Sequence, residues 1–245
     1  MKINFRFAGA CAIVTSLFLW SIAGLKAQDA KAALQEKVAA VKQSLAANQK
    51  ALQPYSWMET TEISMKGEVK KVQKKQCRYG TDGKVIKTDV GGAPEPAAKE
   101  PSGGRGKRGE RVKTKIVENK VDELKDYMED VAALVKQYVP PDPAKIQAAV
   151  QGGKAALNKE SAGIVELAFT DYDIPGDKLA LSFSTATKQL AAVNVDSYLG
   201  KEKDTVTLSV RFAALPDGVN YPAENVLVAK AKQIQVKITN SDYKK

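Results

Sequence analysis

The feature that most constrains the fold is a series of alternating segments in the C-terminal third of the chain. Apolar side chains occupy every second position, and Thr, Ser, Asn, Asp, Arg, Gln and Lys fill the positions between them. One apolar face and one polar face predict an antiparallel sheet that is covered on one side only. The five predicted strands are 164–172, 178–184, 189–198, 205–214 and 226–239.

The N-terminal half predicts three more strands, at 55–65, 68–79 and 84–90, separated by the turn residues Lys66-Gly67 and Thr81-Asp82-Gly83. The second of these strands is rich in lysine, which discourages unwanted pairing, so we expect it near a sheet edge. Cys77 is expected to be a half-buried residue of the same strand.

Three helical segments are available to cover the apolar face. Apolar residues recur at helical spacing over 29–53 and from Val117 to Tyr138, and a third helix is predicted from Asp142-Pro143 to about residue 158. The order of elements predicts an α+β fold: a curved antiparallel sheet, a half-barrel of about eight strands, closed over by helices.

Residues 91–109 interrupt this pattern with Gly, Pro, Ala and Lys and no apolar periodicity, which predicts a mobile insertion. Residues 104–109 match the spacing GxGxxG, but a Pro-rich polar stretch precedes them where a dinucleotide site needs a buried strand. We therefore interpret the segment as a solvated basic loop that can contact an anionic membrane surface.

Residues 1–27 resemble a cleavable secretory signal, with Lys2 and Arg6 ahead of an apolar run and Ala27 at the cleavage point. An uncleaved membrane anchor is the alternative, although a span needs roughly 18 or more apolar residues. A lipoprotein signal is disfavoured because Cys11 lies inside the apolar run. The segment predicts a periplasmic or secreted protein.

Cleavage of 27 of the 245 residues leaves 218, enough for a single domain over 28–245. Loss of Lys2, Arg6 and Lys26 lowers the formal charge from +10 to +7. A basic surface suits anionic lipid headgroups, acidic polymers or nucleic acid, and export makes nucleic acid the least expected partner.

The residue inventory disfavours an enzyme. The chain has no histidine, and Cys77 is the one cysteine after residue 27, so imidazole bases and thiolate metal sites are excluded there. Three carboxylates lie within 171–177 and suit either calcium or a hairpin turn, and turn chemistry already explains them. We therefore expect no catalytic residue, no metal and no cofactor.

The candidate ligand-binding residues are large apolar side chains on the inner face of the predicted sheet. They either line a cavity or fill a core, and the Ala-rich segment 29–53 favours a cavity because its side chains are small. The set is Trp57, Phe169, Leu181, Phe183, Val195, Leu208 and Phe212.

The order of elements, with the turn segments 173–177, 185–190 and 204–208, resembles the periplasmic lipoprotein-carrier (LolA-like) superfamily. The resemblance implies a concave sheet and a helical lid that hold acyl chains, and lipid or an acylated protein as the partner. We expect a non-catalytic envelope protein that binds an apolar ligand. The alternative is a structural or sensory interaction module with a filled core.

Overall fold

The computed structural model describes residues 38–39, 43, 46–91, 122–159 and 163–245. The predicted signal, most of the first predicted helix and nearly all of the insertion at 91–109 lie outside these residues. Within the described part of the chain, no helix has both the length and the apolarity needed to cross a membrane.

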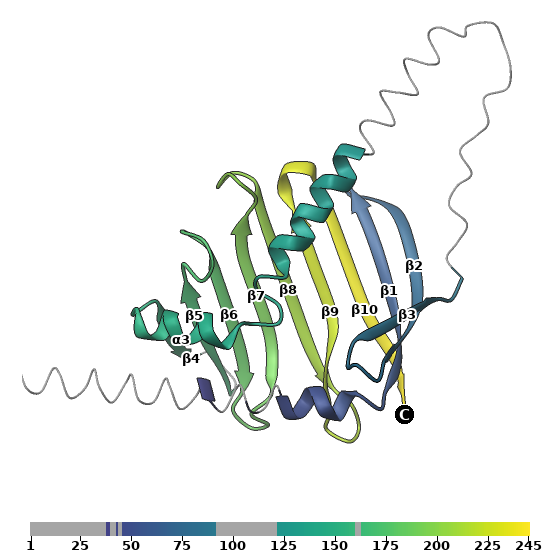
Figure 1. Ribbon diagram of the computed structural model, residues 1–245, viewed down its shortest axis with the longest axis horizontal. Coiled ribbons are helices and arrows are strands. Elements are labelled where there is room, and N and C mark those ends of the chain that lie inside the picture. The colour runs from purple at the N-terminus through teal and green to yellow at the C-terminus, as the bar shows by residue number, and fades with distance from the viewer. Residues whose placement is uncertain (1–37, 40–42, 44–45, 92–121, 160–162) are drawn as a thin grey trace, which may run out of the picture.

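Ten strands join in one antiparallel sheet (Figure 1). The sheet order is β3-β2-β1-β10-β9-β8-β7-β6-β5-β4, so the C-terminal strand β10 lies between β1 and β9. The strands are β1 (Ser56–Met65), β2 (Glu68–Tyr79), β3 (Val85–Asp89), β4 (Ala155–Lys159), β5 (Ile164–Thr170), β6 (Lys178–Ser184), β7 (Leu190–Tyr198), β8 (Thr205–Ala214), β9 (Asn220–Ala229) and β10 (Ile234–Lys244).

The predicted α+β class and the antiparallel sheet are confirmed, but the count of about eight strands is wrong. Residues 155–158, predicted as the end of a helix, belong to β4, because Gly153 adopts a left-handed φ of 72° just after the helix ends. The predicted strand 226–239 is two strands, β9 and β10. Between them lies the short helix η1 (Lys230–Lys232), followed by Gln233 at φ 52°.

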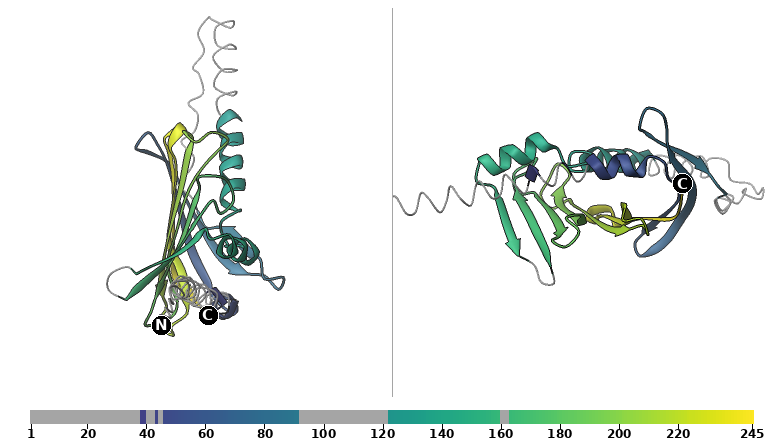
Figure 2. Two further views of the ribbon diagram at one scale, coloured as in Figure 1. Left: turned by 90° about the vertical axis from the view of Figure 1, so that its left-hand side faces the viewer. Right: turned by 90° about the horizontal axis from the view of Figure 1, so that it is seen from below.

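Helical residues 46–52 and 122–135, together with α3 (Pro143–Gln151), lie on the same face of the sheet (Figure 2). The predicted start of α3 is confirmed. The Asp142 side chain caps it by accepting a hydrogen bond from the Ala144 N–H at 2.7 Å, and Pro143 occupies the first turn.

The register between strands places apolar residues in rows on the helix-covered face. One row runs Leu167, Leu181, Val193 and Val210 across β5 to β8. These four residues share a buried cluster with Tyr138 and the apolar side of α3. A second cluster forms where Val131 of the helical segment 122–135 meets the strands, and its other buried members are Val206, Ala229 and Ile234.

Candidate functional site

The structure divides the predicted ligand-binding residues between two places. Five lie together in the larger buried cluster, and Phe212 is partly buried and packs against them. Trp57 is also buried, but it lies on β1, in a different part of the sheet. The five clustered residues are Phe169, Leu181, Phe183, Val195 and Leu208.

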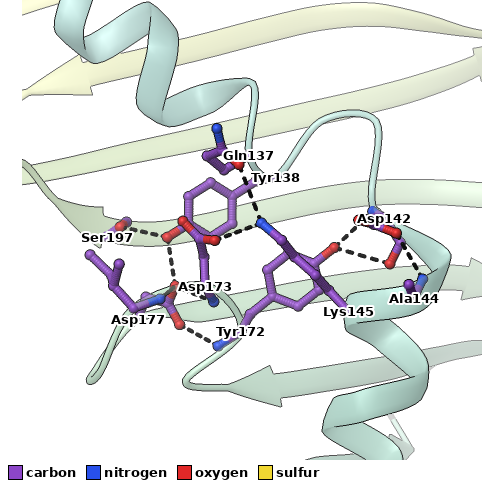
Figure 3. Close-up of polar contacts among 10 residues, drawn as sticks. Gln137, Tyr138, Asp142, Ala144, Lys145, Tyr172, Asp173, Asp177 and Ser197 are labelled. Atoms are coloured by element: carbon purple, nitrogen blue, oxygen red, sulfur yellow. Dashed lines mark hydrogen bonds and ion pairs between the residues drawn. The ribbon is translucent and has the colours of Figure 1, made fainter.

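A buried carboxylate connects the helices to the sheet beside this cluster (Figure 3). Asp177 is only 1 % exposed, and it accepts hydrogen bonds from the backbone N–H groups of residues 172–174 at 2.5 to 2.9 Å. The Tyr138 hydroxyl donates to the same carboxylate at 2.6 Å and lies 2.8 Å from the Ser197 Oγ. Asp177 therefore fixes both its own loop and the end of the helical segment above it.

The other carboxylates of 171–177 also have partners. Asp171 accepts from the Gly176 N–H at 2.7 Å, and Asp173 pairs with Lys145 of α3 at 2.6 Å. Tyr172 accepts a hydrogen bond from the Asp142 N–H at 2.8 Å, and its burial raises its pKa to about 12. These contacts explain the acidic residues of 171–177, which shape the hairpin turn and attach it to the helices. Among the residues described, no group of three metal-ligating side chains occurs.

The strongest candidate binding site is a cavity of about 210 Å³ near Trp57, which we call the aromatic cavity. It lies where β9, β10, β1, β2 and β3 meet the helical residues 46–52. Val85 and Lys87 on its rim are exposed, so the cavity reaches the protein surface. Its lining residues are Leu52, Trp57, Glu59, Tyr79, Val85, Lys87, Pro222, Asn225, Asn240 and Tyr243.

Aromatic rings form one wall of this cavity. Trp57 stacks on Tyr243 of β10 with ring centroids 5.5 Å apart and an interplanar angle of 9°. The ring centroid of Tyr79 on β2 lies 5.3 Å from that of Trp57. Tyr221 contacts Tyr243, with ring centroids 4.4 Å apart. Burial raises the pKa of both Tyr79 and Tyr243, so these rings stay uncharged around neutral pH.

Polar side chains form another part of the lining, which we call the polar wall. Glu59, which is 8 % exposed, has both carboxylate oxygens paired with the Lys87 ammonium at 2.6 and 2.7 Å. The Asn240 amide donates to the Pro222 carbonyl at 2.7 Å. The side-chain oxygens of Asn225 and Asn240 are buried, and no described group donates a hydrogen bond to either.

The strand register explains why these polar groups face the helices. Asn225 pairs with Val210 on one side and Ile238 on the other, so it continues an otherwise apolar row. Glu59 pairs directly with Asn240. The sequence patterns missed both asparagines because the predicted strand 226–239 excluded their positions. The alternation of Asn225 with Leu227 and Ala229 was the signal that could have located the first.

A second hollow of about 600 Å³ lies between Val38, Ala39 and α3. Its described lining residues are Val38, Ala39 and residues between Asp142 and Val150, and no strand residue is among them. The α3 residues Ala144 and Gln147 on its wall are exposed, so this hollow is an open groove, and none of the described residues that line it is a buried polar group.

We compared the chain with known protein families, curated proteins and solved structures. No protein-family model matches the chain, and no curated protein matches it. Among solved structures, it is similar to a DUF1329 family protein from Desulfovibrio piger ATCC 29098. The two share 12 % identity over 83 % of this chain and 92 % of that chain, with a TM-score of 0.37. A likeness of that degree carries no argument about fold or function.

Proposed function

We propose that this chain is a non-catalytic, exported envelope protein of LolA-like type, and that it binds an apolar ligand such as a lipid or the acyl chain of an acylated protein. The observation that carries the proposal is the aromatic cavity, which combines a ring wall, a few polar groups and an opening at the surface. Ligand sites in proteins have this mixture of predominantly apolar walls and a few placed polar groups.

The cavity size limits how much of the ligand it holds. A volume of about 210 Å³ is below the range of drug-sized sites, roughly 300–1,000 Å³. It accommodates a ring, a headgroup or a short chain segment. The remainder of a longer ligand leaves through the rim at Val85 and Lys87.

The chain supplies its own probe for testing this proposal. The sequence has two tryptophans, Trp20 and Trp57, so Trp57 is the only one in residues 28–245. Because Trp57 lines the aromatic cavity, its emission reports on a ligand that binds there. We expect native mass spectrometry of residues 28–245 to show a co-purifying lipid or acylated peptide, and a fatty acid added to delipidated protein to shift the Trp57 emission.

A matched pair of rim variants makes this experiment specific. Val85→Asp places a charge at the mouth of the cavity and is expected to weaken binding about tenfold or more, because an apolar ligand does not compensate a carboxylate. Val69→Asp makes the same change at an exposed position outside the cavity and is expected to bind normally. A lipid-free mass with no emission change, or equal loss in both variants, would contradict the proposal.

One observation favours the alternative, a structural or sensory module that acts through its surface. Strand β2 exposes Lys70, Lys71 and Lys74 together with the apolar residue Val72. This combination suits an anionic membrane surface. If the alternative holds, the protein sediments with anionic vesicles in low salt and is released as ionic strength rises, while Trp57 emission is unchanged by fatty acid.

A further inference from the structure

The polar wall of the aromatic cavity contains acceptors without donors. The Oδ1 atoms of Asn225 and Asn240 are buried and have no hydrogen-bond partner in the part of the chain described here. Asn240 is itself only 7 % exposed. A buried acceptor without a partner carries the full cost of its desolvation, so a donor from outside the chain would stabilise this wall.

The two asparagines are placed for one small ligand group. Asn225 lies opposite Ile238 on β10, and Asn240 lies two residues further along the same face of that strand. Diagonal neighbours on adjacent strands have Cα atoms about 7–8 Å apart, and their side chains approach more closely. Two donors on one short headgroup can therefore meet both oxygens.

The charges around the cavity argue against a charged headgroup. Both oxygens of Glu59 are already occupied by Lys87, so the pair is neutral as it stands. A cation entering here would be an uncompensated charge in a partly buried site, and an anion would lie beside Glu59. A neutral group with O–H or N–H donors meets neither penalty.

We propose that the aromatic cavity selects an uncharged headgroup that carries hydroxyl or amide donors, which Asn225 and Asn240 accept, on an otherwise apolar ligand. This inference rests on the proposed function and adds the headgroup class to it. The aromatic rings contact the apolar part next to the headgroup. A ligand without donors leaves both asparagine oxygens without a hydrogen bond, so it binds less tightly.

The test compares three probes of similar chain length by titration of Trp57 emission in residues 28–245. Monooctanoylglycerol is uncharged and has two hydroxyl donors, methyl octanoate has no donor, and octylammonium is a cation. We expect monooctanoylglycerol to bind about tenfold more tightly than methyl octanoate, since about 1.4 kcal/mol corresponds to a factor of ten. Octylammonium is expected to bind more weakly than monooctanoylglycerol.

Two asparagine variants test whether the preference for monooctanoylglycerol arises at the polar wall of the aromatic cavity. Asn225→Leu is expected to reduce the preference for monooctanoylglycerol over methyl octanoate to about threefold or less, because one acceptor is gone. Asn194→Leu makes the same change on the opposite face of the sheet, at an exposed residue of β7, and is expected to keep the full preference.

Other results would contradict either the headgroup inference alone or both proposals. Equal binding of monooctanoylglycerol and methyl octanoate, an unchanged preference in Asn225→Leu, or tightest binding of octylammonium would overturn the headgroup inference and leave the proposed function standing. If none of the three probes changes Trp57 emission, both proposals are wrong.

Discussion

At the scale of single residues, Asp177 links its own loop on the sheet to Tyr138, just after the helical segment 122–135. Asp177→Ala removes the acceptor for the buried N–H of Tyr172, for the part-buried N–H groups of residues 173 and 174, and for the Tyr138 hydroxyl. We expect the free energy of unfolding to fall by about 3 kcal/mol, because each unsatisfied buried donor costs about 1–3 kcal/mol and the loop relaxes in part. Urea denaturation of residues 28–245 at pH 7 measures the change.

Asp196→Ala is the control for this prediction. Asp196 is an exposed residue of β7, on the face away from the helices. A surface substitution of this kind usually changes stability by less than about 0.5 kcal/mol. Similar losses for the two variants would show that Asp177 does not anchor the helices.

The raised pKa of Tyr172 predicts that the free energy of unfolding falls at alkaline pH. Burial raises its pKa from 10.0 to about 12 in the folded protein. The folded state keeps the phenol proton while the unfolded state loses it, so the stabilisation is complete below pH 10 and is lost as pH rises towards 12. The loss of folding free energy amounts to about 3 kcal/mol, because each of the two pKa units corresponds to about 1.4 kcal/mol.

The variant Tyr172→Phe isolates this effect. At pH 9 it is expected to be about 1 kcal/mol less stable than the wild type, because the Asp142 N–H loses its acceptor. Near pH 12 this difference in the free energy of unfolding should vanish or reverse, because phenylalanine does not titrate. Denaturant unfolding of both proteins at pH 9 and pH 12 measures this difference. If the difference is the same at both pH values, the pKa of Tyr172 does not change on folding.

At the scale of elements, the helical segment 122–135 is attached to the sheet through Val131, which is fully buried against Val206, Ala229 and Ile234. Val131→Ala removes two methyl groups from this contact and leaves a cavity. We expect the free energy of unfolding to fall by about 2 kcal/mol. Chemical denaturation followed by circular dichroism measures the loss.

The same substitution at Val69 provides the comparison. Val69 is 54 % exposed on β2, and Val69→Ala should change stability by less than about 0.5 kcal/mol. If the two substitutions lower the free energy of unfolding equally, the helical segment 122–135 is held to the sheet by contacts other than those of Val131.

Most elements could be predicted from the sequence because alternation of apolar and polar residues marks a one-sided sheet. The bounds of β2 and β6 were predicted at Glu68–Tyr79 and Lys178–Ser184, as found. β4 and the boundary between β9 and β10 could not be predicted. Residues 230–232 contain no Gly or Pro to mark the turn, and Leu157 continues the apolar spacing of the preceding helix.

At the scale of the whole molecule, the candidate site was harder to predict than the fold. The aromatic positions of the C-terminal strands indicate an inner face, but they do not show that helices fill the space over Phe169 and Leu181. The aromatic cavity depends on β10 returning beside β1, which brings Asn240 next to Glu59 across more than 180 residues. No local pattern encodes that neighbour.

Cys77 connects this cavity to the stability of the surrounding sheet. It is the sole cysteine of residues 28–245, it is fully buried, and it pairs with Trp57 on β1 and Lys87 on β3. Burial also raises the pKa of its thiol, which lowers the thiolate fraction further. Labelling by a thiol reagent therefore requires β1, β2 and β3 to separate.

A ligand in the aromatic cavity contacts residues of all three strands and binds only while they are paired. Monooctanoylglycerol at ten times its dissociation constant is therefore expected to slow Cys77 labelling about tenfold, by the factor of one plus the ratio of ligand concentration to dissociation constant. In Val85→Asp the same concentration should leave the rate nearly unchanged. If Trp57 emission shows saturation while the labelling rate of the wild type stays constant, the ligand does not hold these strands together, and its site lies outside the cavity that they form.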